Sequence, residues 1–205
     1  MTALAIPDAD ERGDLGAFVA RVVRLDPTAT ARLRAGDGTV TAWAATPFDV
    51  LATRTVHGRL DPPDVTVSAN ALLTALAVEK AASVDPGAGG LWPGDLPPDS
   101  GWSPVDVVPA AEIDALTERG LTVARENAGP LGPPASLLDQ NVLTVSAASG
   151  PTVKVPLRCL FALSGMGFVD PDGEVRVSAT GAWLRLDAHY GAVVRRRTLT
   201  LPLLV

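Results

Sequence analysis

Apolar residues recur three or four positions apart in several stretches of the chain, and this spacing predicts amphipathic helices. The two clearest helices are expected over residues 14–25 and, after a proline that suits the first helical turn, over 110–127. Two more are expected where a short strand leads into an apolar stripe, over 68–82 and 156–165. An Asp-Pro pair, which often starts a helix, predicts a further short helix over 27–34.

Other stretches alternate apolar and polar residues, which is typical of strands with one buried face. In the segment 39–45, the small apolar residues fall on one side and Trp43 falls on the other. The expected strands cover 39–45, 48–56, 65–67, 142–146, 152–155, 173–179, 181–188 and 192–203. Residues 1–12 are interpreted as a flexible acidic arm. Helices mixed with a mainly antiparallel sheet predict an α+β fold.

The segment 85–104 is dense in glycine and proline and continues neither a helix nor a sheet. It contains Trp92 and Trp102, whereas a merely flexible linker seldom carries two tryptophans. We therefore expect four side chains to lie anchored on the domain surface, those of Leu91, Trp92, Leu96 and Trp102, with a partner-binding role as the alternative. The segment divides the chain into an N-terminal α+β unit over 1–84 and a C-terminal α+β unit over 105–205.

Two stretches of the sequence are similar to each other. Residues 65–73 and 153–161, at a spacing of 88 residues, both indicate a short strand that runs into a helix. The matches are confined to this stretch, so a true duplication stays open. Units of this kind resemble those of sliding clamps at the level of the fold, and such a likeness carries no function by itself.

Charge is distributed unevenly along the chain, although the net charge is only −6. Residues 61–150 carry three basic and twelve acidic side chains, whereas residues 151–205 carry seven basic and four acidic ones. The C-terminal part is therefore expected to dock on this acidic middle, with separate partner surfaces as the alternative. Arg195, Arg196 and Arg197 form the one concentrated basic feature, which could protect a strand edge or contact another surface. Too few bases accompany them for a nucleic-acid groove, so the sequence argues against nucleic acid as a partner.

No arrangement of residues in the sequence indicates a catalytic, cofactor-binding or metal-binding site. His57 and His189 stand apart and fall at predicted turns or strand ends. Cys159, the one cysteine, lies in an apolar helical stripe, where a buried and inert thiol is expected. We expect neither a cofactor nor a metal. Whether the chain is an enzyme stays open, and the sequence favours a non-catalytic protein.

Three stretches of the sequence form recognisable motifs. They are Leu91-Trp-Pro-Gly-Asp-Leu-Pro-Pro with Gly101-Trp102, Val108-Pro-Ala-Ala-Glu-Ile-Asp-Ala-Leu, and Val155-Pro-Leu-Arg-Cys-Leu-Phe-Ala-Leu with Met166-Gly-Phe168. These motifs resemble an uncharacterised family of two-domain proteins from Actinobacteria, whose two domains are of unknown function. The resemblance covers most of the chain. It implies kinship only, because the family brings no assigned activity and no site residues.

The absence of clustered chemistry and the uneven charge favour a non-catalytic cytoplasmic interaction or scaffold protein. Its candidate interaction surface is formed by Trp92, Trp102 and the arginines 195–197. The alternative is a small-molecule-binding protein, or an enzyme of unrecognised type, with its pocket between the two units. The apolar stretch 198–205 also suggests a homodimer that pairs through the C-terminal strand. No apolar run is long enough for a membrane helix and the N-terminus lacks a signal peptide's basic start, so we expect no membrane contact.

Overall fold

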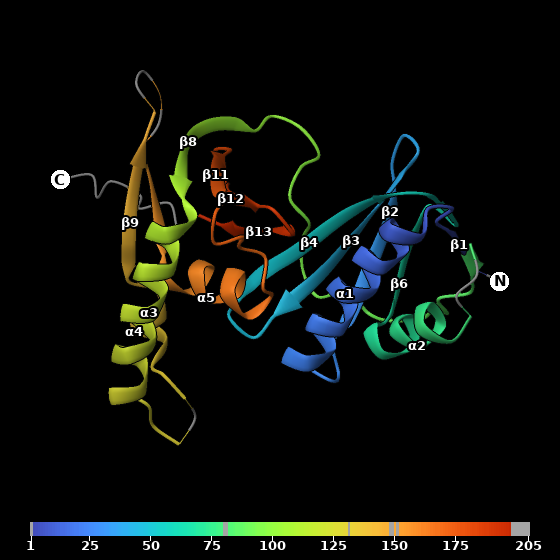
Figure 1. Cartoon of the computed structure of the whole chain (residues 1–205), viewed down its shortest axis with the longest axis horizontal. Coiled ribbons are helices and arrows are strands. Elements are labelled where there is room, and N and C mark those ends of the chain that lie inside the picture. Colours follow the sequence, from blue (N-terminus) through green and yellow to red (C-terminus); the bar gives the residue numbers. More distant parts are fainter. Residues whose placement is uncertain (1, 80–81, 131, 148–149, 151, 198–205) are drawn as a thin grey trace.

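Strands from both ends of the sequence meet in one eight-stranded antiparallel sheet (Figure 1). The computed structural model describes residues 2–79, 82–130, 132–147, 150 and 152–197. The strands of this sheet are β2 (Thr30–Ala35), β3 (Thr39–Thr46), β4 (Val50–His57), β6 (Asp64–Ser68), β8 (Ser103–Pro109), β11 (Glu174–Ala179), β12 (Trp183–Ala188) and β13 (Gly191–Arg196). Their order across the sheet is β6–β2–β3–β4–β13–β12–β11–β8. Two smaller sheets consist of β1 (Ala3–Ala5) between β5 (Arg59–Asp61) and β7 (Ser83–Val84), and of β9 (Asn141–Ser146) with β10 (Thr152–Pro156).

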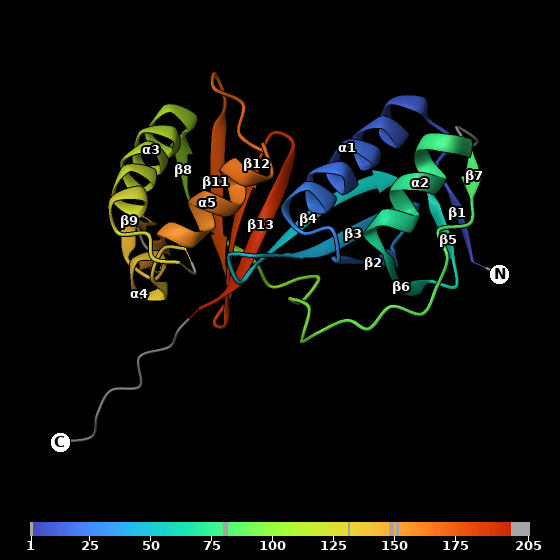
Figure 2. The same cartoon turned by 90° about the horizontal axis from the view of Figure 1, so that it is seen from below.

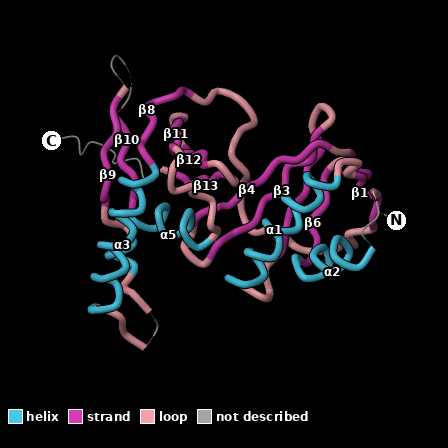
Figure 3. The backbone as a smooth tube through the Cα atoms, in the orientation of Figure 1, coloured by secondary structure: helices cyan, strands magenta, loops and turns pink. Residues whose placement is uncertain are grey.

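The longer helices pack in two pairs on one side of the strands. Helix α1 (Ala9–Leu25) contacts α2 (Ala69–Glu79), and α3 (Ala110–Glu126) contacts α5 (Leu157–Gly165), beside which lies the short α4 (Ala135–Leu138). In Figure 3 the helices follow one another from α3 through α5 and α1 to α2. No helix in the described part of the chain is long and apolar enough to cross a membrane.

Alternation along the strands gives the large sheet two different faces. On β3, Ala42 and Ala44 belong to the main core beneath the helices, and Val193 of β13 belongs to it too. Trp43 and Val194, each next to one of these residues, belong to a separate cluster on the other side. We call the side away from the helices the outer face.

The pairing of β4 with β13 joins the N-terminal and C-terminal parts of the chain in one sheet. Close to this junction, the buried Arg158 of α5 donates from Nε to Asp139 Oδ1 (2.9 Å) and from Nη1 to the Phe48 carbonyl oxygen (2.8 Å). These bonds hold the turn between β3 and β4 against α5. The sheet is thus continuous across the junction, and the division into units 1–84 and 105–205 stays a prediction.

The α+β fold and most of the expected elements are confirmed. The expected helix over 110–127 is α3, and the expected strand over 39–45 is β3 with its tryptophan on the outer face. The two similar stretches, 65–73 and 153–161, correspond to two strand-to-helix units, β6–α2 and β10–α5. Residues 198–205 lie outside the described residues, so a homodimer through them remains a prediction.

Two expectations for the N-terminal part are wrong. The segment 1–12 is not a flexible arm, because Leu4 is buried in the three-stranded sheet and the Asp8 carboxylate accepts hydrogen bonds from two amides at the start of α1. The segment 27–34 is not a helix but contains most of β2. Its residues follow the two-residue period of a strand, with Ala31 and Leu33 in the core, and this pattern outweighs the Asp-Pro helix signal.

Candidate interaction surface

All four tryptophans of the chain lie together on the outer face of the sheet. Trp43 of β3 and Trp183, the first residue of β12, are buried and form a floor with Val194. Trp92 and Trp102 come from the connection between β7 and β8 and pack on this floor as half-buried side chains. We call these four side chains the tryptophan cluster.

The connection over residues 85–102, which we call the strap, crosses the outer face. Figure 2 shows it on the side of the sheet opposite α1 and α2. The Gly90 amide donates a hydrogen bond to the Thr66 carbonyl oxygen at 3.0 Å, which fastens the strap to β6. Further along, Leu96 packs against the tryptophan cluster and Pro97 is buried. The expected anchoring on the domain surface is confirmed for Trp92, Leu96 and Trp102. It is wrong for Leu91, whose side chain is exposed and packs against none of the cluster.

Two arginines lie over tryptophan rings of the cluster. The Cζ atom of Arg196 is 5.3 Å from the ring centre of Trp183, and that of Arg185 is 5.9 Å from the ring centre of Trp102. Trp183 and Arg196 meet because they are opposite residues in the pairing of β12 with β13. At exposed sites such cation–π contacts contribute about 0.5–1 kcal/mol, and they leave guanidinium donors at the surface.

The basic residues at the end of β13 pair with acidic residues from earlier in the chain. Arg195 Nη2 lies 3.4 Å from Asp49 Oδ2 and 3.3 Å from Asp139 Oδ1. Arg196 Nη2 lies 2.8 Å from Asp95 Oδ2 of the strap. Since Asp95 and Asp139 belong to the acidic middle of the sequence, the expected charge contact between the two regions is present in these pairs.

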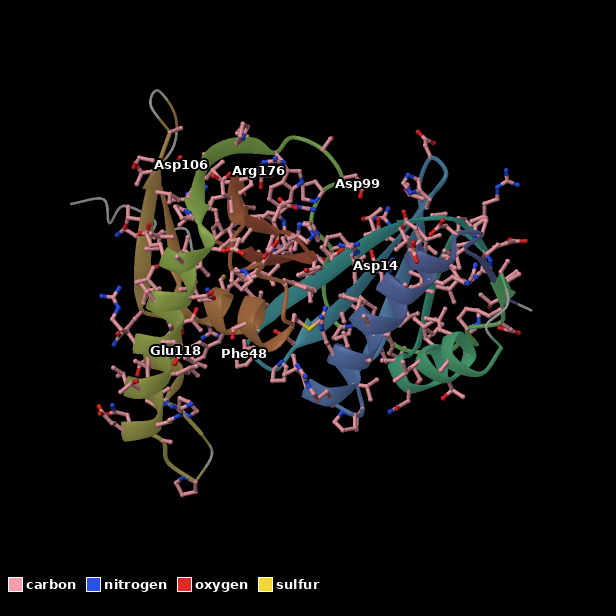
Figure 4. The ribbon with its side chains drawn as sticks, in the orientation of Figure 1. Asp14, Phe48, Asp99, Asp106, Glu118 and Arg176 are labelled. Carbon is pink, nitrogen blue, oxygen red and sulfur yellow. The ribbon has the colours of Figure 1, made fainter. Side chains whose placement is uncertain are left out.

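Two hollows of about 620 Å³ each lie on the outer face. The first, the junction hollow, draws its lining from both halves of the chain and includes Arg34, Thr41, Trp43, Trp102, Arg176 and Arg185. The second, the arginine hollow, is lined by Leu51, Pro93, Asp95, Trp183 and the arginines 195–197. Arg197 also donates from Nη1 to the Thr180 carbonyl oxygen at 2.9 Å. In Figure 4, Asp99 and Arg176 of the junction hollow lie on the upper side of the view, away from Phe48 and Glu118.

The cysteine and the two histidines, which are the remaining candidates for catalytic or metal-binding roles, lie apart from one another in the structure. Cys159 is completely buried, and burial raises the pKa of its thiol to about 12, as expected for an inert cysteine. His57 is exposed at the end of β4, where its Nδ1 lies 2.7 Å from Glu11 Oε1, and His189 is exposed beside Tyr190. Within the described ranges, no group of three or more His, Cys, Asp or Glu side chains could hold a metal ion.

The sequence located only part of this surface. Trp92, Trp102 and Arg196 lie at the tryptophan cluster, and Arg197 lines the arginine hollow beside it. Arg195 follows Val193 to the helix side, where it pairs with Asp49 and Asp139. Trp183 and Arg185 were not singled out in the sequence. A signal for Trp43 was present, because it occupies the face of its strand that otherwise carries threonines. No comparable signal places Trp183 beside it, since their contact depends on strands far apart in the sequence. That these residues form an interaction surface remains a prediction.

The fold is similar to that of bacterial DNA polymerase sliding clamps. Over 96% of this chain, a clamp from Caulobacter crescentus is 18% identical, with a TM-score of 0.60. Over 98% of it, a clamp from Pseudomonas aeruginosa is 14% identical and a putative DNA polymerase III β subunit from Eubacterium rectale is 10% identical, with TM-scores of 0.60 and 0.61. The chain spans 65–66% of these proteins, just under two thirds of their length. At such identities the likeness concerns the fold alone.

Family comparison divides the chain near the strap. No curated protein matches the chain. Residues 1–92 match a domain of unknown function, DUF8010, and residues 97–200 match a second one, DUF8185. The expected resemblance to proteins with two domains of unknown function is thereby confirmed, while an actinobacterial origin stays a prediction. Because the second match extends over half of the sequence, the chain belongs to the family of the domain of unknown function DUF8185.

Proposed function

We propose that the chain is a non-catalytic interaction protein that holds a partner protein against the outer face of its sheet. The observation that carries this proposal is the gathering of all four tryptophans on that face, with Arg185 and Arg196 stacked over two of the rings. Tryptophan and arginine are enriched among the residues that dominate protein–protein binding, because both combine a large contact area with directional hydrogen-bond donors.

The surroundings of the cluster have the chemistry of an interface. Apolar rings lie at the centre, and charged side chains such as Arg34, Asp99 and Arg176 lie around them. An apolar centre within a polar rim is the usual arrangement of protein–protein interfaces. The two hollows add concave spaces into which side chains of a partner could insert.

The clamp-like fold supports a tethering role. The similar structures carry the name of DNA polymerase sliding clamps, and one holds polyethylene glycol at a putative β-motif tethering region. From the tethering region of that clamp we transfer to the present chain only the idea of a tethering role. We do not transfer contact with DNA, because helices α1 and α3 together carry seven acidic and five basic side chains.

Capture from cell extract tests the proposal with two variants of equal charge change. Arg196→Glu alters the outer face, whereas Arg119→Glu alters the exposed surface of α3. Proteins captured by the tagged wild-type chain are quantified by mass spectrometry. We expect a partner that is lost with Arg196→Glu and retained with Arg119→Glu. Equal retention of every captured protein by both variants would place binding elsewhere and contradict the proposal.

A small-molecule-binding protein is a second candidate, favoured by the junction hollow. This hollow lies between the two halves near Trp102, and about 620 Å³ is within the range of pockets for small ligands. A thermal-shift screen over nucleotides and metabolites tests this candidate. Stabilisation by several degrees with one compound class, reduced by Arg176→Ala, would favour it. A uniform absence of stabilisation would leave the interaction protein as the better conclusion.

A further inference from the structure

Two polar atoms on the outer face, one of them in the strap, are buried without a hydrogen-bond partner among the described residues. They are Nε1 of Trp92 and Oγ1 of Thr53, which lies opposite Trp43 in the pairing of β3 with β4. A buried donor or acceptor without a partner costs about 1–3 kcal/mol. The contact between the strap and the outer face is therefore incompletely satisfied.

The ion pairs that attach the strap to the sheet involve exposed side chains. The side chains of Arg196 and Asp95, whose ion pair ties the strap to β13, are 64% and 72% exposed. Exposed ion pairs contribute only about 0–1 kcal/mol. Leu91 is 90% exposed and adds nothing to the packing. Gly94, at a φ of +96°, lets the strap turn between Trp92 and Leu96 without side-chain strain.

The composition of the strap shows which chemistry the outer face accepts. Apolar side chains of Trp92 and Leu96 pack on the tryptophan cluster, and Pro97 is buried beside them. One acidic side chain lies within this stretch and another follows it: Asp95 pairs with Arg196, and Asp99 lies 3.4 Å from Arg34. Grooves lined by aromatic rings bind extended proline-rich segments well, because proline restricts the free peptide and lowers the entropy lost on binding.

We infer that the strap is an intramolecular occupant of the partner site, and that the partner presents an extended, proline-rich, acidic segment in its place. This inference rests on the proposed function and adds the class of partner. If the strap covers the site most of the time, a partner binds only to the fraction of molecules in which the strap is displaced. The apparent dissociation constant then rises in inverse proportion to that fraction. A change within the strap that loosens it and leaves the outer face intact must therefore tighten the binding of a competing segment.

A labelled peptide with the sequence of residues 91–98, Leu-Trp-Pro-Gly-Asp-Leu-Pro-Pro, is the probe. Its binding to the full chain is measured by fluorescence anisotropy. The strap is loosened by Trp92→Ala together with Leu96→Ala, and the floor is removed by adding Trp183→Ala to that variant. Adding Arg119→Glu to it provides a control on the helix side. A peptide in which lysine replaces the aspartate tests the acidic requirement.

We expect the loosened variant to bind the peptide about tenfold more tightly than the wild-type chain does. Trp183→Ala and the lysine peptide should each abolish the gain, whereas Arg119→Glu should preserve it. Equal or absent binding by the wild-type chain and the loosened variant, with unchanged circular dichroism, would overturn the inference. If a partner is still lost with Arg196→Glu in the capture experiment, the proposed function survives and only the class of partner is wrong.

Hydrogen exchange of the wild-type chain keeps the inference testable if the loosened variant does not fold. We expect the Gly90 amide, which donates to the Thr66 carbonyl oxygen, to exchange at least about a hundredfold faster than the amides in the centre of β3, because the strap opens without unfolding the sheet. Added peptide should accelerate this exchange further by holding the strap open. A Gly90 amide that exchanges as slowly as those of β3 would overturn the inference.

Discussion

At the scale of single residues, Trp92 ties the strap to the sheet. For a fully buried ring, Trp92→Ala would cost roughly 3 kcal/mol or more. Because this ring is half-buried and its Nε1 has no partner among the described residues, we expect a smaller loss of about 1–2 kcal/mol in the free energy of unfolding. Urea denaturation measures the loss. Leu91→Ala, at an exposed neighbour, should change the same quantity by less than about 0.5 kcal/mol, and an equal loss there would contradict the argument.

Two carboxyl groups make the fold sensitive to acid. Hydrogen bonds from His57 and Arg32 hold the pKa of Glu11 below 4.5 and that of Asp64 below 3.8. The unfolded chain therefore takes up these protons at a higher pH than the native chain does. Their stabilisation is fully present above the unfolded values and is lost as the pH falls through the lower native values.

Replacing one of these carboxyl groups should make the free energy of unfolding decrease less as the pH falls. We expect Asp64→Asn to reduce the fall in unfolding free energy between about pH 5 and pH 3 by less than about 1 kcal/mol, because the side chain is partly exposed. Urea denaturation across this pH range measures the slope. Asp37→Asn, at the exposed turn between β2 and β3, is the matched control. Identical slopes for Asp64→Asn and the wild-type chain would refute the expectation.

At the scale of elements, the approach of α3 to α5 depends on Gly120. A Cβ atom at this position would lie 2.4 Å from Leu157 Cδ1 and 3.2 Å from Phe161 Cε1. We expect Gly120→Leu to destabilise the fold by about 1–3 kcal/mol, although leucine favours helices. Gly13→Ala in α1 meets nothing within 4 Å and should stabilise it by about 0.5–1 kcal/mol. Thermal unfolding measures both changes, and stabilisation by Gly120→Leu would show that the helices can separate at no cost.

The elements that were predicted correctly are those whose signal is local. The period of α3 and the alternation of β3 are both complete within a few residues, so each is readable without knowledge of its neighbours. Strand β2 was missed because the pair Asp26-Pro27 favours the start of a helix. In the structure the Asp26 carboxylate accepts hydrogen bonds from Thr28 and forms a turn before the strand. Its strand conformation is stabilised by pairing with β3 and β6, which is a long-range effect.

At the scale of the whole molecule, the sequence could not predict how the two halves meet. The pairing of β4 with β13 brings residues about 140 positions apart into register, as with Leu51 and Val194, and no local pattern encodes such a partner. The candidate surface was therefore only partly visible. Trp92 and Trp102 stood out because of their Gly/Pro-rich surroundings, while the floor that holds them requires the assembled sheet.

The charge of the helix side leads to the last prediction, which concerns DNA. The fold is similar to that of sliding clamps, but α1 and α3 carry more acidic than basic side chains. Duplex DNA binds a protein surface strongly only where basic side chains neutralise its phosphates and release its counterions. We expect a labelled 30-base-pair duplex to bind more weakly than about 10⁻⁴ M at physiological salt, as measured by fluorescence anisotropy. The double variant Glu112→Lys and Glu118→Lys, which reverses two charges of α3, should bind detectably and lose that binding as salt is added. Micromolar binding by the wild-type chain, weakening steeply with salt, would contradict this expectation and place DNA among its partners.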